Sequence, residues 1–325
     1  MNTKEETMTA AILDGRARAK DMQAEIEQQV KDFVAAHGFV PTMAVVRAGE
    51  DPASVSYART ILNTMEKRGL KAAAHVLPAD VLQAELVALV ARLSADPDVH
   101  GIMIQEPYPK GIDPNAVLAV LNPVKDVDGV HPQNAGLLAQ AEPVGRGEAG
   151  PAFFVPATPA GGMELMRRYG VEFAGKHAVV VGRSNIVGKP MGLLLLRENA
   201  TVTLCHSRTA DLAAVCRQAD ILAAAVGRAR MIRGDWIKPG AVVVDFGVNF
   251  VKACPSCGAD NRDTATACAR CAADLSAVEA AMAGDVDYAA GLEVAGLITP
   301  VPGGTGPMTN VMLMKNLLAA AGGRS

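Results

Sequence analysis

This chain has few aromatic residues and only a small excess of negative over positive charge. Only 4% of its 325 residues are aromatic, whereas 50% are hydrophobic, with Ala, Val and Leu predominant. This composition favours parallel strands covered by helices over a β-sandwich. A net charge of -3 gives no electrostatic basis for binding nucleic acid or an anionic membrane. We therefore expect no nucleic-acid partner.

Long uncharged apolar runs are also missing. No run is long enough to span a bilayer. The first residues, Met1-Asn-Thr-Lys-Glu-Glu, lack the basic segment and following apolar stretch of a leader peptide. We therefore expect no membrane partner and a cytoplasmic location. A chain of this length is expected to form about two domains, each able to bury a core.

The order of apolar segments predicts an α/β fold. A helical pattern from Asp14 to His37 is followed by a strand, Thr42 to Ala48, and by a helix that opens at Asp51-Pro52 and closes at Gly69. The alternation continues with the strand Lys71–Leu77, the helix Asp80–Ser94, the strand Val99–Gln105 and the helix Asp113–Leu121. Such alternation indicates βαβ crossovers and a parallel sheet. Because ligands bind beyond the carboxyl ends of such strands, Gln105-Glu106-Pro107-Tyr108-Pro109 is a candidate site loop.

A glycine-rich turn in the second half indicates a nucleotide site. The strand Ala178–Val181 leads into Gly182-Arg183-Ser184 and then, from Gly188, into an amphipathic helix. Glycine lets the backbone approach a phosphate, and a helix start offers free N–H groups to an anion. The spacing departs from G-x-G-x-x-G, so the glycines alone fit an ordinary strand-to-helix turn about as well.

The end of the next strand adds to this argument. It runs Thr203-Leu-Cys205-His206-Ser207-Arg208, with no carboxylate at the end. NAD enzymes carry Asp or Glu there to hold the adenosine ribose, whereas cations accommodate the 2′-phosphate of NADP. Arg183, Ser207 and Arg208 therefore favour NADP. Later strands are expected at Asp220–Val226 and Ala241–Phe246.

Three polar or Gly/Pro-rich segments are expected to be loops. Lys125 to Pro132, which contains Asp128, has the chemistry of a polar turn, and an ordinary Asx turn explains it equally well. Gln140 to Gly150 has the composition of a linker. Ile298 to Thr309 is rich in Gly and Pro and is expected to be a rigid loop, followed by an apolar helix to about Ala320.

Four of the six cysteines form two C-x₂-C pairs, Cys254/Cys257 and Cys268/Cys271. This pattern brings four thiolates to one metal ion and predicts a closed structural zinc site with no catalytic role. Two disulfides and a rubredoxin-like iron site are the alternatives; strain in so short a ring disfavours the first, and the ligands alone do not exclude the second. Cys205 and Cys216 are expected to be inert packing residues.

Several blocks together resemble the methylenetetrahydrofolate dehydrogenase / methenyltetrahydrofolate cyclohydrolase family, in the family's order and over nearly the whole chain. They are Gly49-Glu-Asp-Pro-Ala-Ser54 with Tyr57, Val99-His-Gly-Ile-Met-Ile-Gln105, Lys125-Asp-Val-Asp128-Gly129, Gly182-Arg-Ser-Asn-Ile-Val-Gly-Lys-Pro190, Thr203-Leu-Cys-His-Ser207 and Pro300-Val-Pro-Gly-Gly-Thr-Gly-Pro-Met-Thr309.

The resemblance implies a homodimer whose subunits bind tetrahydrofolate one-carbon derivatives between an N-terminal catalytic domain and a C-terminal Rossmann domain. It implies that Tyr57 stacks near the pterin, that Asp128 holds its amino edge, and that Gln105 serves the chemistry of the one-carbon bridge. Ser54 and Pro302-Gly303-Gly304 are implied to contact substrate. The cofactor residues implied are Gly182, Arg183, Ser184, Gly188, Ser207, Arg208 and Val248.

The domain assignment follows from these blocks. Residues 1–150 are expected to form a three-layer folate-binding domain and residues 151–298 the NADP-binding domain. The four-cysteine segment, residues 252–274, stands where the family has a brief connection and is expected to form a zinc-ribbon-like insertion. Residues 299–325 are expected to return to the N-terminal domain.

One departure bears on the chemistry. The family carries its lysine four residues after the tyrosine, and this chain has Ile61 there, while Glu106 stands where the family usually has leucine. Hydride loss from methylenetetrahydrofolate needs no obligatory base, but hydrolysis of the methenyl cation needs proton transfers that isoleucine cannot perform. We therefore expect a dehydrogenase with weak or absent cyclohydrolase activity. The alternatives are that Glu106 serves as a substitute base, or that the protein binds a pterin with little turnover.

Overall fold

The computed structural model describes residues 9–142 and 153–323. It consists of two compact units, which we treat separately. One contains Gly162–Met308 together with the chain up to Arg16, and the other contains Ala17–Gly161 together with the chain from Thr309 onward. The chain passes between the units within three helices, α1 (Gly15–His37), α6 (Ala157–Arg168) and α10 (Thr305–Gly322).

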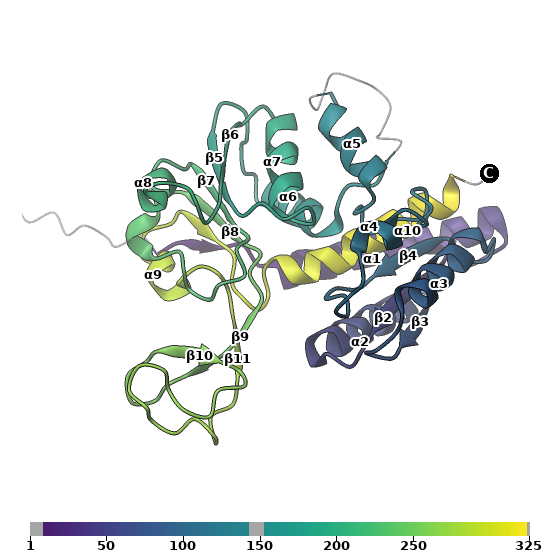
Figure 1. The fold of residues 1–325 in the computed structure, drawn as a ribbon. Coiled ribbons are helices and arrows are strands. Elements are labelled where there is room, and N and C mark those ends of the chain that lie inside the picture. Colours follow the sequence, from purple (N-terminus) through teal and green to yellow (C-terminus); the bar gives the residue numbers. More distant parts are fainter. Residues whose placement is uncertain (1–8, 143–152, 324–325) are drawn as a thin grey trace, which may run out of the picture. The chain divides into compact units, whose positions relative to one another are not determined.

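The first unit is built on a parallel sheet of six strands in the order β1-β12-β8-β7-β5-β6 (Figure 1). These strands are β1 (Ala11–Ile12), β5 (His177–Val181), β6 (Thr201–Cys205), β7 (Ile221–Ala224), β8 (Val242–Asp245) and β12 (Leu297–Ile298). The helical elements of this unit between the strands are α7 (Gly188–Arg197), α8 (Leu212–Cys216), the 3₁₀ turn η1 (Gly234–Trp236) and α9 (Tyr288–Leu292). The central strands are apolar on both faces because helices cover both, as the predicted Rossmann-type fold requires.

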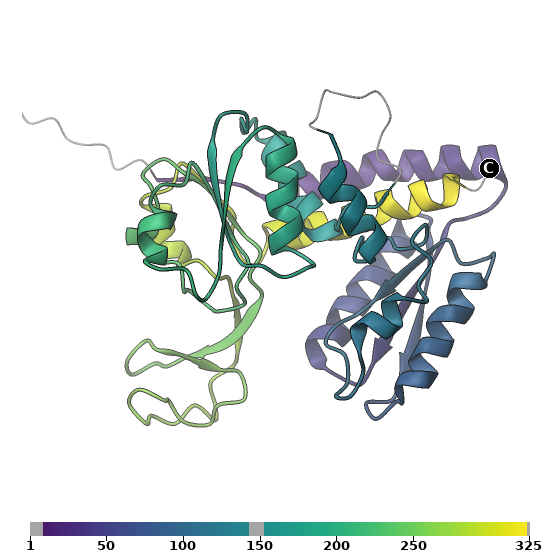
Figure 2. The same ribbon diagram turned by 45° about the horizontal axis from the view of Figure 1, so that its top comes forward.

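The second unit contains a parallel three-stranded sheet in the order β3-β2-β4. Its strands are β2 (Thr42–Ala48), β3 (Lys71–Leu77) and β4 (Gly101–Ile104), and its further helices are α2 (Pro52–Lys67), α3 (Gln83–Ala95), α4 (Pro114–Leu118) and α5 (Pro132–Gln140). Leu86, Leu89 and Val90 of α3 pack on Ala44 and Ile102 of the sheet. Helices α2 and α3 lie on opposite sides of this sheet, which is therefore the centre of a three-layer arrangement (Figures 1 and 2).

A small lobe extends from the first unit on two strands (Figure 1). β9 (Asn249–Ala253) pairs antiparallel with both β10 (Asp260–Arg262) and β11 (Ala281–Ala283). We call residues 249–283 the four-cysteine lobe, because both C-x₂-C pairs lie within it. Its buried core consists of Cys254, Cys268 and Leu275.

The sequence predicted the bounds of β2 and β3 correctly, but other elements differ from expectation. Helix α5 forms between the predicted polar turn and the predicted linker, where no element was predicted. Helix α10 begins at Thr305, so the loop predicted to run to Thr309 ends at Gly304. Strand β1 was not predicted, because two residues give no periodic signal. Most of the predicted linker, residues 143–150, lies outside the described residues.

Within the described residues, no helix has the length and apolar character needed to cross a bilayer.

Candidate active site

The glycine turn after β5 is held by close backbone contacts. Gly182 has φ +138°, and a Cβ there would lie 2.1 Å from the carbonyl oxygen of Ala225. A Cβ on Gly188 would lie 2.4 Å from the carbonyl oxygen of Gly182. No side chain larger than glycine fits either position without displacing backbone. The turn is thus a tight backbone cradle at the carboxyl end of β5.

Helix α7 begins at Gly188 rather than directly after Gly182. The hydroxyl oxygen of Ser184 accepts hydrogen bonds from the N–H groups of Val187, at 3.1 Å, and Gly188, at 3.2 Å. Ser184 therefore stabilises the start of the helix. Its hydroxyl hydrogen can still be donated to a ligand oxygen.

A cationic edge adjoins this cradle. β5 and β6 pair in parallel with Val181 opposite Cys205, so the residues that follow the two strands are neighbours. Arg183, Ser207 and Arg208 are all exposed there. The turn after β6 is fixed by Nδ1 of His206, which accepts the N–H of Arg208 at 3.2 Å. Two guanidinium groups and a hydroxyl suit a phosphate monoester such as the 2′-phosphate of NADP.

Two buried aspartates, which the sequence reasoning missed, support the loops beside this cradle. Asp245, at the end of β8, accepts the N–H groups of Gly247 and Val286, both at 2.8 Å. Burial raises the pKa of Asp245 to about 7 against these donors. Asp285 is fully buried and organises the loop after β7. For Asp245, the sequence signal was a charged residue within the otherwise apolar run Val242–Phe246. Val248 follows β8 and is 60% exposed.

The loop Pro302–Gly304 packs on the start of α1 within the same unit. The N–H of Arg16 donates to the carbonyl of Gly303 at 3.1 Å. A Cβ on Gly15 would lie 1.7 Å from the carbonyl oxygen of Gly304. Gly303 and Gly304 are buried whereas Pro302 is exposed. The predicted contact of this loop with substrate remains a prediction.

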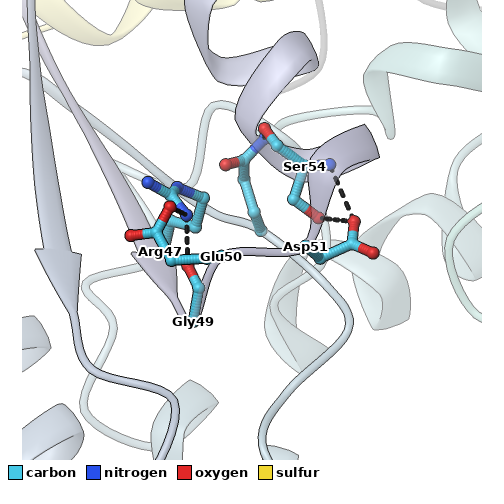
Figure 3. Close-up of polar contacts among 6 residues, drawn as sticks. Arg47, Gly49, Glu50, Asp51 and Ser54 are labelled. Carbon is cyan, nitrogen blue, oxygen red and sulfur yellow. Dashed lines mark hydrogen bonds and ion pairs between the residues drawn. The ribbon is translucent and has the colours of Figure 1, made fainter.

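In the second unit, Ser54 joins α2 to the loop after β4. Asp51 caps α2, and its carboxylate accepts the N–H and the hydroxyl of Ser54 at 2.8 and 2.9 Å (Figure 3). The Ser54 hydroxyl is also within 3.2 Å of the Glu106 carbonyl, and the side-chain amide of Gln105 donates to the Ser54 carbonyl at 3.2 Å. Figure 3 shows the buried Arg47 near the start of α2, where its guanidinium donates to the Gly49 carbonyl. The contacts of Ser54 are structural, and its predicted role with substrate stays a prediction.

Tyr57 and Ile61 follow on α2 and differ in exposure. Ile61 is 1% exposed and lies in the core, so an apolar side chain fills the position where a family lysine was expected. Tyr57 is half-buried; burial, with a contribution from the charge of Asp128, raises the pKa of its hydroxyl. The charge of Asp128 therefore acts on the Tyr57 hydroxyl.

Carboxylates dominate the electrostatics of this region. Burial, with the charges of Asp126 and Glu106 adding to it, raises the pKa of Asp128 to about 8. Glu106 is exposed as a whole residue, but partial burial of its carboxyl group raises the pKa of that group. Tyr108, which feels the same charges, has its pKa raised to about 12, chiefly by burial. The buried Oε1 of Gln105 has no hydrogen-bond partner among the residues that the structure describes. This group of residues can accept protons and bind an electron-poor or cationic ring.

The turn that carries Asp128 is built by its neighbours. The fully buried Asp126 accepts the N–H of His131 at 2.7 Å and the amide of Asn134 at 2.8 Å. Lys125 is buried too, and its ammonium donates to the carbonyls of Leu93 and Asp96. An Asx-type turn therefore exists here and is made by Asp126, and the predicted site role of Asp128 stays a prediction.

The four cysteine sulfur atoms of the lobe lie within 4.8 Å of one another. The Sγ atoms of Cys254 and Cys271 are 3.6 Å apart, as are those of Cys257 and Cys268. Tetrahedral zinc with Zn–S bonds of about 2.3 Å places sulfurs about 3.8 Å apart. The four cysteines are free thiols, and so are the buried Cys205 and Cys216.

The two C-x₂-C turns have the same backbone design. The N–H of Gly258 donates to the Cys254 carbonyl and that of Ala272 to the Cys268 carbonyl, both at 2.8 Å. Gly258 and Ala272 both have positive φ, +69° and +59°. Backbone N–H groups also reach the Cys254 sulfur; although burial opposes them, the pKa of that thiol is lowered. Paired turns of this kind present sulfur atoms toward one metal ion.

The fold and these sites define a two-unit α/β protein of the dinucleotide-binding class. The chain belongs to the tetrahydrofolate dehydrogenase/cyclohydrolase family. Residues 13–128 match the family's catalytic domain, and residues 156–324 match its NAD(P)-binding domain.

Relatives support this membership over almost the whole chain. The bifunctional protein FolD of Chloroflexus aurantiacus is 49% identical over 313 residues, which cover 96% of this chain and 98% of that protein. The Trypanosoma brucei methylenetetrahydrofolate dehydrogenase-cyclohydrolase, solved with NADP and an inhibitor, is 36% identical with a TM-score of 0.84, covering 97% of this chain and 98% of that one. The FolD enzyme of Campylobacter jejuni is 35% identical with a TM-score of 0.83, covering 97% and 100%.

Proposed function

We propose that the protein catalyses NADP-dependent oxidation of 5,10-methylenetetrahydrofolate to 5,10-methenyltetrahydrofolate. The observation that carries the proposal is the cradle of Gly182 and Gly188 beside Arg183, Ser207 and Arg208. Its backbone fits a pyrophosphate and its cationic edge fits a 2′-phosphate. NADP, when bound, supplies the hydride acceptor.

The chain's own residues bind and orient in this reaction. A C–H bond of the methylene bridge breaks, and the hydride leaves with its electron pair while the adjacent nitrogen lone pair forms a C=N bond. No proton is transferred, so no base is required, and alignment supplies most of the rate enhancement. We assign the pterin's amino edge to Asp128, ring stacking to Tyr57 and contact with the one-carbon bridge to Gln105.

We propose that cyclohydrolase activity is weak or absent. Hydrolysis of the methenyl cation needs a water to lose a proton and a leaving nitrogen to gain one. Ile61 is buried and apolar, so it supplies neither step. The relatives named above are bifunctional by name, so a chain without cyclohydrolase activity would differ from them in function.

Glu106 as a substitute base is the second candidate, favoured by the raised pKa of its carboxyl group. A carboxylate whose pKa lies nearer neutrality is a better proton acceptor at physiological pH. In this case the chain would keep both activities, and the second would depend on Glu106 alone.

One assay distinguishes these proposals. NADPH formation and methenyl absorbance are followed together with purified protein, methylenetetrahydrofolate and either NADP or NAD. We expect NADPH and the methenyl product to accumulate in parallel. Methenyl hydrolysis far above the buffer rate would refute the loss of cyclohydrolase, and its disappearance in Glu106→Gln would assign it to Glu106. Tight pterin binding without NADPH formation would refute the dehydrogenase.

We further propose that the four-cysteine lobe holds one structural Zn²⁺. The sulfur separations and the paired turns support it, and a site with four protein ligands leaves no open position for catalysis. Metal analysis should find one zinc per chain, lost in the Cys254→Ser/Cys257→Ser double variant and retained in Cys216→Ala, which alters a cysteine outside the cluster. Iron would instead give a coloured protein, and a metal-free protein with intact thiols would refute the site.

We also propose, from the family resemblance alone, that the protein is a homodimer; its cytoplasmic location is proposed from the sequence. Light scattering coupled to gel filtration should give twice the 33.7 kDa chain mass. A mass of one chain over the working concentration range would contradict it.

A further inference from the structure

The base of the four-cysteine lobe is hydrogen-bonded to a residue of the dinucleotide-binding unit. Asn249 is the first residue of β9, and its side-chain amide donates to the carboxylate of Asp285 at 3.0 Å. The same amide donates to the carbonyl of Ala283, the last residue of β11, at 3.2 Å. One side chain therefore joins both strands that carry the lobe to Asp285.

Asp285 in turn fixes the loop that follows β7. Its carboxylate accepts three consecutive backbone N–H groups, from Val226 at 2.6 Å, Gly227 at 3.0 Å and Arg228 at 2.8 Å. The residue is 0% exposed, so every donor matters. A buried carboxylate that loses a donor keeps its desolvation cost without the compensating bond. The position of this loop thus depends on how Asp285 is held.

The same loop packs directly against the glycine turn of the cofactor cradle. The N–H of Ala225 donates to the carbonyl of Val181 at 2.8 Å, immediately before Gly182. The carbonyl of Ala225 occupies the space into which a Cβ on Gly182 would project. A shift of the loop after β7 therefore changes the surface on which the glycine turn rests.

A second link runs outside this chain of contacts. The guanidinium of Arg230 pairs with the carboxylate of Asp260 in β10, at 2.5 Å. Arg230 belongs to the same loop, and its N–H donates to the carbonyl of Gly284 at 2.9 Å. Arg230 therefore joins the loop after β7 both to β10 and to Gly284, the residue that follows β11.

The core of the lobe is small, and its partly buried apolar members are mostly alanines. Two of the three members of its buried core are the ligands Cys254 and Cys268. So small a core does not offset the entropy of ordering the chain, and metal binding supplies folding free energy in such lobes. Metal loss is therefore expected to loosen β9 and release Asn249 from Asp285.

We propose that metal occupancy of the four-cysteine lobe raises the affinity for NADP, acting through Asn249 and Asp285 on the loop after β7. Asn249 and Asp285 are positioning residues here, because they act through that loop. The inference rests on the proposed dinucleotide and zinc sites. It makes the lobe a device through which metal or thiol oxidants adjust cofactor binding.

The test uses the full chain, as purified and after removal of zinc by a chelator. Titration calorimetry gives the Kd for NADP in each state and after zinc is restored. The single tryptophan, Trp236, packs against the core of the six-stranded sheet, so its fluorescence reports whether that domain stays folded. Asn249→Ala breaks the link while leaving the thiols in place, and Asn63→Ala, an exposed site on α2, is the matched control.

We expect zinc removal to weaken NADP binding about tenfold with unchanged Trp236 fluorescence, and zinc to restore it. Zinc-loaded Asn249→Ala should bind NADP about as weakly and should not respond to the chelator, whereas Asn63→Ala should behave as the parent. An unchanged Kd after zinc loss, or in Asn249→Ala, would overturn the inference and leave the zinc site standing. If the chain binds no zinc, the proposed metal site is refuted. If it never binds NADP, the proposed function is refuted.

Discussion

Ile61 follows Tyr57 by four residues on α2, so the two side chains lie one helical turn apart on the same face. Tyr57 is half-buried beside Asp128, whereas Ile61 is almost fully enclosed by the core. The turn of helix that borders the proposed pterin site therefore offers an aromatic ring and a methyl-rich surface. It offers no ammonium group at this point.

Replacing Ile61 with lysine should create hydrolytic activity. A positioned amine that transfers protons accelerates such steps by about 10² to 10⁴. We expect Ile61→Lys to open methenyltetrahydrofolate at least about 100-fold faster than the parent, at some cost in stability because the side chain replaces a buried one. Loss of methenyl absorbance measures the rate. Ile61→Met, which keeps volume and polarity, should leave hydrolysis at the buffer level, and equal rates in both variants would exclude the amine as the cause.

Arg208 should control the choice between NADP and NAD. Its exposed guanidinium follows β6 at the edge where the 2′-phosphate is proposed to bind. We expect Arg208→Ser to raise the KM for NADP about tenfold while the KM for NAD stays within about twofold, because a charge-assisted bond is lost only with the phosphorylated cofactor. Arg92→Ser, an exposed change on α3, serves as the control. A parallel rise of both KM values would instead indicate general damage to the cradle.

The sequence alone predicted those elements that a single local pattern determines. Thr42–Ala48 is predicted to be a strand because it is apolar apart from Thr42 and Arg47, and it forms β2. Asp51 was predicted to cap α2, and its carboxylate does accept the N–H of Ser54. The strand-to-helix alternation likewise specifies a parallel sheet, because only a crossover joins such strands.

The remaining features depend on partners distant in the chain. Ile12 becomes part of a strand only because Ile298 pairs with it. The carboxylate of Asp285 finds its donors 57 to 59 residues earlier, and no local pattern marks such a residue. Gln105 was predicted as a site residue, but its bond to Ser54, 51 residues away, emerges only from the packing of β4 beside α2.

The stability of the protein should fall as pH rises from about 4 to about 8. Asp128 has its pKa raised from 3.8 to about 8, by burial first and then by the charges of Asp126 and Glu106. The folded state then holds a proton that the unfolded state has already released, so raising the pH favours unfolding within this window. Denaturant unfolding at several pH values should show a smaller slope in Asp128→Asn. Asp245 titrates in the same range, so the difference between the two proteins is the informative quantity; parallel curves would contradict the assignment to Asp128.

Gly182 and Gly175 allow a direct test of the cofactor cradle, because both have positive φ but differ in their surroundings. A Cβ on Gly175 meets nothing within 4 Å, whereas one on Gly182 would lie 2.1 Å from the Ala225 carbonyl oxygen. Gly175→Ala should therefore cost about 1 kcal/mol of backbone strain and leave NADP binding unchanged. Gly182→Ala must displace the loop after β7, and we expect it to cost more than about 3 kcal/mol and to weaken NADP binding at least tenfold. Denaturant unfolding and calorimetry measure the two quantities; NADP binding that survives Gly182→Ala at parental strength would show that the glycine turn does not form the cradle.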